Sequence, residues 1–400
     1  MPFLRQVTAL LSRAASAPDA GGRLPGVPAF WTWFAAEAAA MRAAVASGRR
    51  LERRVMRRLR ERLAALRPGV GFVVERGADS GARLVLTSGH EATGEATHVA
   101  WVEAFVAAAP AVPGWAIVAL RPALGEATGE VAVGTLAVGP HTLTWAPAED
   151  PARPGAACVR LFHAGADGPD ADLLPEATEL FLHNYLGERA MIEALDDYDL
   201  AAAPAPGEEA AALAELPAYL KAVAAERARL LTRAAPPERF EAVQVMEAGT
   251  WRTSAVYDRA VLTWPGRAGA PYVAGITVAD ERPGESPAPA QTEALDALGR
   301  DLAAALPREA GNYLLGRLRA EAEFVIYVGC RDYRSAGAAL EVLAQAHRPR
   351  LELHVSLYRD LGWADAAYAF GADGPEGWGE DTVGDYDRRV AAAPWEGDWW

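Results

Sequence analysis

The sequence predicts an α+β protein with two domains. The chain has 400 residues, 51% hydrophobic and 23% charged, which is enough to bury more than one core. Helical apolar periodicity alternates with short β-like runs in both halves. A Pro- and Ala-containing stretch, AAAPAPGEEA, separates the halves. The predicted organisation is a leader (1–27), an N-terminal α+β domain (28–200), a linker with a connector helix (201–236), a C-terminal domain (237–370) and a tail (371–400).

The N-terminal domain is predicted to be a mixed sheet packed by one long, arginine-rich helix over 28–66. Apolar residues recur there at near-helical spacing, and RPGVG ends the pattern. A β-hairpin, a helix and a strand follow, then three more β-like runs and a closing helix. The predicted ranges are 71–75, 82–88, 97–108, 115–122, 131–138, 141–147, 157–163 and 175–195.

The C-terminal domain is predicted to be ferredoxin-like. After β-like runs from Phe240 onward, the order from Tyr272 is strand, helix, strand, strand, helix, strand, which is the βαββαβ motif. The predicted ranges are 272–279, 291–306, 313–320, 323–330, 335–347 and 351–358. From Gly371 the chain is rich in Gly, Asp and Glu, a composition typical of disorder.

Composition and motifs argue against several kinds of chemistry. Lys221 is the only lysine and has no Gly-rich loop beside it, so lysine catalysis is not expected. Phosphate-loop, dinucleotide-loop and nucleophile-elbow motifs do not occur, and no cofactor is predicted. Cys158 and Cys330 lie far apart in apolar runs, which predicts buried free thiols of a reducing compartment. Without a signal peptide or an apolar membrane span, a cytoplasmic protein with no membrane partner is expected.

Two segments contain residue types that can ligate a metal ion. HEATGEATH contains His90, Glu95 and His98, but its histidines lie eight residues apart, whereas a zincin helix has them four apart. EALDDYDL brings carboxylates together near Asp196, which could ligate a divalent ion. A solvated loop and a solvated helix end, respectively, are the favoured interpretations, and no metal site is predicted. His163 lies in an apolar stretch, as core histidines do.

The strongest electrostatic feature is the basic segment RRLERRVMRRLRERLAALR at 49–67. Residues 1–70 hold 13 arginines and 4 acidic residues, whereas the whole chain has a net charge of −14, which makes nucleic acid an unexpected partner. Two interpretations remain open: a face that follows RNA phosphates, and the favoured one, a packing helix whose arginines pair with acidic neighbours. The candidate binding residues, which can share one helical face, are Arg49, Arg53, Arg57 and Arg60.

Aromatic residues mark both ends of the chain. In FWTWF, helical spacing places Phe30, Trp33 and Phe34 on one side, where we expect them to pack between the long helix and the sheet. The acidic tail ends in EGDWW, and Trp399 and Trp400 are candidate anchors of a docking segment. Its target would be another protein or the chain's own basic face; an extension without function is an equal alternative.

The C-terminal region resembles the bacterial domain-of-unknown-function family numbered 695. The resemblance rests on the helix EALDALGRDLAAAL (293–306), the hairpin NYLLGRLRAEAEFVIYVGCRDY (312–333) and the ending RDLGW (359–363). Within these segments Gly316, Arg317, Phe324, Tyr327, Asp360 and Trp363 fit the family pattern, whereas the hairpin Gly and Arg of the family are replaced around 321–323. The N-terminal half resembles a module that precedes this domain, through FWTWF, PGWAIVALRP and LFLHNYLGERAMIEAL.

Family 695 is similar in style to the regulator of ribonuclease activity B, a ferredoxin-like inhibitor of ribonuclease E. That resemblance implies an α/β plait acting by protein binding, although fold likeness alone transfers no function. The leading expectation is therefore a non-catalytic protein-binding or regulatory module. The alternatives are a hydrolase or metal-dependent enzyme with a site at the domain interface near His90, Glu95 or Asp196, and an RNA-associated regulator using the arginine face. No oligomeric state follows from the sequence.

Overall fold

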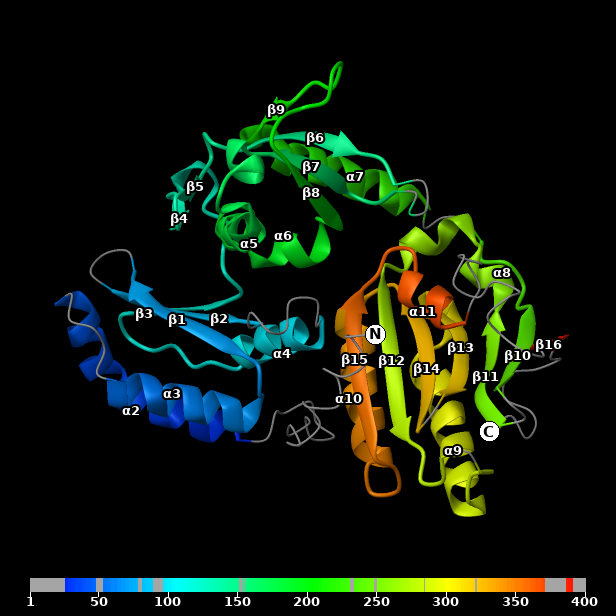
Figure 1. Ribbon diagram of the computed structural model, residues 1–400. Coiled ribbons are helices and arrows are strands. Elements are labelled where there is room, and N and C mark those ends of the chain that lie inside the picture. Colours follow the sequence, from blue (N-terminus) through cyan, green and yellow to red (C-terminus); the bar gives the residue numbers. More distant parts are fainter. Residues whose placement is uncertain are drawn as a thin grey trace. The chain divides into compact units, whose positions relative to one another are not determined.

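A computed structural model describes residues 26–47, 53–77, 81–88, 96–150, 153, 155–230, 234–247, 250–283, 285–320, 322–370 and 386–390 (Figure 1). The described residues form two compact units, an N-terminal unit that ends at Arg227 and a C-terminal unit that begins at Ala228. Each unit combines helices with β-sheet, so the predicted α+β class is confirmed.

The first described elements of the N-terminal unit are two antiparallel helices, α2 (Val27–Ala46) and α3 (Arg53–Leu66), which lie side by side in Figure 1. The prediction of one helix over 28–66 is therefore wrong. The first helix ends where Ser47 and Gly48 follow it, since glycine has low helix propensity and favours helix ends. Leu59 and Leu63 of α3 are fully buried, so the predicted apolar stripe does face the core.

These helices pack on a three-stranded sheet of order β1-β2-β3, formed by β1 (Gly71–Arg76), β2 (Ala82–Thr87) and β3 (Trp115–Ala119). The first two strands form the predicted antiparallel hairpin. Strands β2 and β3 are parallel and are joined through α4 (Ala96–Ala107), which gives a βαβ crossover. Phe105 of α4 contacts Phe30 and Trp31 of α2, with ring centroids 5.0 and 4.8 Å apart.

The rest of the N-terminal unit consists of two further sheets and the helices that pack on them. A short hairpin pairs β4 (Val131–Val133) with β5 (Leu136–Val138). A four-stranded sheet has the order β8-β7-β6-β9 and packs against α5 and α7 through one apolar cluster. The other helices and strands of this part are β6 (Thr144–Ala148), β7 (Cys158–Phe162), α5 (Leu174–Tyr185), α6 (Glu188–Glu193), β8 (Asp197–Ala201), β9 (Ala211–Ala212) and α7 (Leu216–Leu230).

This part of the unit differs from two predictions. The expected helix over 175–195 is divided at Gly187, whose φ of +81° is a backbone conformation that glycine adopts without strain. Within the expected linker and connector helix at 201–236, residues up to Arg227 belong to the N-terminal unit, and Leu213, Leu216 and Leu220 are buried in its apolar cluster. The boundary between the units follows Arg227, inside the predicted range. The Pro and Ala residues of 201–206 therefore form a surface connection between β8 and β9.

The C-terminal unit is built on one antiparallel sheet of order β15-β12-β14-β13-β11-β10-β16 (Figure 1). The strands are β10 (Phe240–Glu247), β11 (Thr250–Asp258), β12 (Tyr272–Ala279), β13 (Asn312–Ala320), β14 (Glu323–Cys330), β15 (Leu353–Arg359) and β16 (Tyr386–Val390). Helices α9 (Pro289–Ala305) and α10 (Tyr333–His347) pack together and connect β12 to β13 and β14 to β15. The predicted order β-α-β-β-α-β is thus present, and β10, β11 and β16 widen its sheet.

The short helices α8 (Arg259–Leu262) and α11 (Ala364–Ala369) contribute to an apolar cluster with β11, β12 and β13. Trp363 is the largest fully buried side chain of this cluster. The tail was predicted to be disordered from Gly371 onward, and this is wrong for 386–390, which form β16 and pair with β10. The remainder of the tail, including Trp399 and Trp400, lies outside the described residues.

Candidate functional site

The residues that sequence reasoning connected with catalysis have structural roles or lie outside the described residues. Both cysteines are buried and free, and burial raises the pKa of Cys158 to about 11 and that of Cys330 to about 12. Such thiols carry almost no thiolate near neutral pH, so neither is an activated nucleophile. Among the described residues, no three His, Cys, Asp or Glu side chains are placed to hold a metal ion.

The carboxylates of EALDDYDL were expected at a solvated helix end, and this is wrong for Asp196. Its side chain is 1% exposed, and one oxygen accepts from Arg227 at 2.5 Å and from the Ala157 N–H at 2.7 Å. The Arg227 guanidinium also donates to the Gly155 carbonyl. Asp196 therefore attaches α7 to the loops that lead into β7 and β8, and its charge is already used by Arg227.

Of the histidines considered in the sequence, two lie in the described part of the chain. His90 and Glu95 lie outside the described residues, whereas His98 packs under Gly69 and its Nδ1 lies 3.3 Å from the Ser88 carbonyl oxygen. His163 is buried and accepts from the Gly165 N–H at 3.0 Å, as expected for a core histidine. The contacts of His98 and His163 are structural, and these two histidines form no catalytic arrangement with other described residues.

A buried polar cluster around Glu188 was not foreseen from the sequence. The Glu188 carboxylate is 4% exposed and accepts three hydrogen bonds, from the N–H and hydroxyl of Ser88, both at 2.6 Å, and from the Arg121 N–H at 3.0 Å. Leu120, beside it, has a φ of +64°, which is rare outside glycine. Since both carboxylate oxygens are used by protein donors, the cluster joins the ends of β2 and β3 to α6 and offers no group for chemistry.

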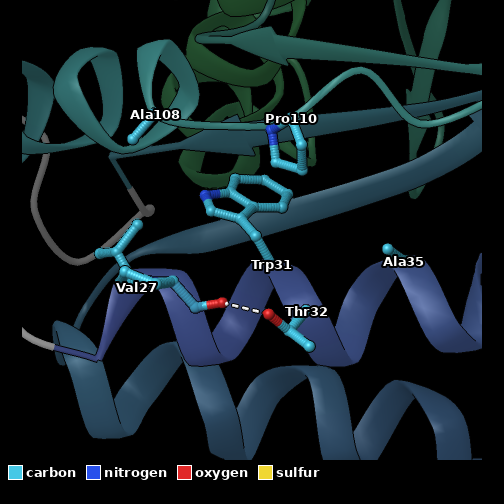
Figure 2. A pocket seen from close by; sticks show the side chains of 7 residues that line it. Val27, Trp31, Thr32, Ala35, Ala108 and Pro110 are labelled. Atoms are coloured by element: carbon cyan, nitrogen blue, oxygen red, sulfur yellow. Dashed lines mark hydrogen bonds between the residues drawn. The ribbon is translucent and has the colours of Figure 1, made fainter.

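A hollow of about 390 Å³ lies at the start of α2, shown in Figure 2. Trp31 points into it, and the Thr32 hydroxyl donates to the Pro28 carbonyl at 2.8 Å. No titratable side chain is present, so the hollow can hold an apolar group but supports no acid–base or metal chemistry. Its lining residues are Val27, Pro28, Trp31, Thr32, Ala35, Ala108 and Pro110.

Two residues of the resemblance to family 695 have clear structural roles. The Asp360 carboxylate accepts from the N–H groups of Gly362, Ala364 and Asp365 and so caps α11. Trp363 is fully buried over Gly329, and its indole donates to the Ala270 carbonyl at 2.8 Å. Both residues therefore stabilise the fold of the C-terminal unit.

The candidate binding arginines are placed only in part. Arg49 lies outside the described residues, and Arg53 begins α3. Arg57 and Arg60 are exposed on α3, where Arg57 lies 3.6 Å from Glu61, one turn along the same helix. Both are therefore available to a partner on the surface of the N-terminal unit.

The structure shows a second set of arginines that the sequence reasoning missed. Arg58 and Arg62 point toward Trp33 of α2, and their Cζ atoms lie 5.9 and 4.6 Å from its ring centroid. The Arg58 guanidinium also donates to the Glu37 carboxylate at 3.3 Å. We call Trp33, Glu37, Arg58 and Arg62 the arginine–tryptophan cluster. Its contacts are of the cation–π and surface ion-pair kinds.

Helical spacing explains how the cluster forms. Trp33 and Glu37 are four residues apart on α2, Arg58 and Arg62 are four apart on α3, and the two pairs meet because the helices are antiparallel. Phe30, Trp31 and Phe34 are the buried aromatics of FWTWF. The prediction that Trp33 joins the core is therefore wrong: Trp33 is half-buried at the seam between the helices. The spacing of FWTWF alone did not show this, because it depends on where α3 begins.

Comparison with models of protein families, with curated proteins and with solved structures gives no match to the chain. The resemblance to family 695 and the assignment of the C-terminal unit to the ferredoxin-like fold therefore stay predictions. No helix within the described part of the chain has the length and apolar character needed to cross a membrane.

Proposed function

We propose that this chain is a non-catalytic cytoplasmic protein that binds an acidic segment of another protein through the exposed side of α3. The observation that carries the proposal is the arrangement of four arginines, at 57, 58, 60 and 62, on a helix whose Leu59 and Leu63 are fully buried. Three of the four are exposed, and Arg58 is half-buried. Such a surface attracts negative charge.

Two further observations support the proposal. The free, buried thiols suit a reducing compartment. The acidic and histidine residues suspected of catalysis are, where described, occupied by structural contacts such as the Asp196–Arg227 pair. A protein partner is favoured over RNA, because the whole chain is acidic and would repel a long polyanion.

The test is a titration of a fluorescently labelled Asp/Glu-rich peptide with the full chain, followed by anisotropy at low and physiological salt. We expect the variant R57Q/R58Q/R60Q/R62Q to lose binding, while the control R331Q/R348Q, which removes two exposed arginines of the C-terminal unit, retains it. Binding should weaken as salt rises, because the charges are solvent-exposed. Equal binding by the quadruple variant would contradict the proposal, and tight binding of single-stranded RNA but not of the peptide would favour the RNA alternative.

A further inference from the structure

We propose that the arginine–tryptophan cluster is a carboxylate-binding site, in which Arg58, Arg62 and the indole N–H of Trp33 hold the side-chain carboxylate of an Asp or Glu in the partner. This inference rests on the proposed function and adds the group that is recognised and the residues that recognise it.

The first supporting observation is an unused donor. The Trp33 Nε1 is covered and has no acceptor among the described residues. Its neighbours differ: the Trp31 indole donates to the Phe105 carbonyl at 3.3 Å and the Trp115 indole to the Ala38 carbonyl at 3.0 Å. Buried indole N–H groups are normally hydrogen-bonded. Trp33 itself is only half-buried, and the Arg58 and Arg62 side chains lie over its ring, so a carboxylate that draws these side chains aside would gain access to the unused N–H.

The second observation is the concentration of positive charge beside that donor. Arg58 and Arg62 lie one turn apart on α3 and both approach the Trp33 ring. Like charges at this spacing destabilise a helix slightly. Within the described residues Arg62 meets no carboxylate, so its charge is offset only by the ring. An anion between the two guanidinium groups would reduce their repulsion and accept from planar donors suited to a carboxylate.

The third observation is that a carboxylate already lies at the rim. Glu37 accepts from Arg58 at 3.3 Å, and both side chains are only about one-third exposed, 34% for Glu37 and 39% for Arg58. Glu37 therefore occupies one of the donors that an incoming carboxylate would use. This predicts competition, in which loss of the Glu37 charge strengthens binding of the acidic ligand. It also indicates a carboxylate ligand, because a carboxylate is the group that the cluster accommodates.

The experiment measures the dissociation constant of the same labelled acidic peptide for single variants of the full chain. We expect about tenfold weaker binding for R58Q and for R62Q, since each removes a charged donor from the site. W33F keeps the ring and removes the N–H, and should weaken binding about three- to fivefold. E37Q should strengthen binding about three- to fivefold, which is the reverse of what loss of a structural ion pair would do. R331Q/R348Q, on the C-terminal unit, is the control and should leave binding unchanged. R57Q/R60Q removes the two arginines of the same face that lie outside the cluster, and should weaken binding less than R58Q or R62Q does.

Unchanged peptide binding by both W33F and E37Q would overturn the carboxylate site. The proposed function would still stand in that case if R57Q/R60Q alone weakened peptide binding as much as the quadruple arginine variant does. No effect of any arginine variant would overturn both. Competition at constant ionic strength separates the ligand classes: acetate displacing the peptide at least as well as inorganic phosphate supports a carboxylate site. Displacement by phosphate alone would overturn the assignment. Thermal unfolding of each variant confirms that the fold is retained.

Discussion

Replacing Asp196 by Ala should destabilise the N-terminal unit by about 3–5 kcal/mol, the range for breaking a buried ion pair by removing one partner. The structure accounts for a value in that range. The Arg227 side chain is 8% exposed and would lose the Asp196 carboxylate, and the Ala157 N–H would lose the same acceptor. A charged hydrogen bond contributes roughly 1.5–3 kcal/mol and a buried donor left unpaired costs about 1–3 kcal/mol.

The assay is urea unfolding of the full chain, with D196A, R227M and D196L/R227M measured beside the wild type. We expect the double variant to recover most of the lost stability, because apolar side chains of similar volume can replace a buried ion pair. The transition of the C-terminal unit is the internal control, since Asp196 and Arg227 both belong to the N-terminal unit. Two results would refute the reasoning. One is a loss of unfolding free energy below about 1 kcal/mol for D196A, which is typical of an exposed ion pair. The other is that the effects of D196A and R227M add up in the double variant, which is typical of residues that do not interact.

Three further predictions concern other buried groups. Glu188→Ala removes the acceptor of three hydrogen bonds and should lower the free energy of unfolding by about 2–4 kcal/mol, as measured in urea. A decrease of less than about 0.5 kcal/mol would show that these hydrogen bonds do not stabilise the unit. Trp363→Ala should destabilise the C-terminal unit by about 3–5 kcal/mol and leave acidic-peptide binding unchanged; lost binding in the folded variant would place the site elsewhere. Burial raises the pKa of Asp258, whose Oδ1 accepts three backbone N–H bonds. Between the unfolded and folded pKa values the folded state therefore holds more protons than the unfolded state, and stability falls as pH rises through that window. Asp258→Asn keeps the acceptor and should lose this fall when unfolding is measured from pH 3 to 7; an unchanged pH profile would contradict the assignment.

Much of the C-terminal unit was predictable, because its order of strands and helices follows from local patterns. Short apolar runs, the turn near Ala320 and the helical spacing of 291–306 are all local signals. The pairing of β10 with β16 was not predictable, because acidic, glycine-rich composition indicates disorder and carries no information about a strand that joins a distant edge. The boundary between the two units falls within the predicted range 201–236, after Arg227. The composition did not show that 201–227 belongs to the N-terminal unit, because a Pro- and Ala-rich stretch resembles a linker even when the following helix packs in the core.

For the candidate site, sequence patterns indicated the basic helix but not the side chains that meet Trp33, and a binding role for that helix stays a prediction. The sequence places Arg57 and Arg60 correctly on an exposed face. Arg58 and Arg62 were not chosen, because the interpretation that 28–66 is one helix cannot bring α3 back against Trp33. Because the chain breaks between α2 and α3, α3 packs against α2, and this packing brings Arg58 and Arg62 to Trp33 and Glu37.

The pairing of β10 with β16 has a practical consequence for work with the isolated C-terminal unit. A fragment that ends at residue 370 contains every element from β10 to α11 but lacks the outermost strand. The outer edge of β10 would then present unpaired N–H and C=O groups over the stretch from Glu241 to Val245, and such an edge recruits strands from neighbouring molecules. Recombinant fragments should therefore extend beyond Val390, and aggregation of a shorter one would report a missing strand and not an unstable core.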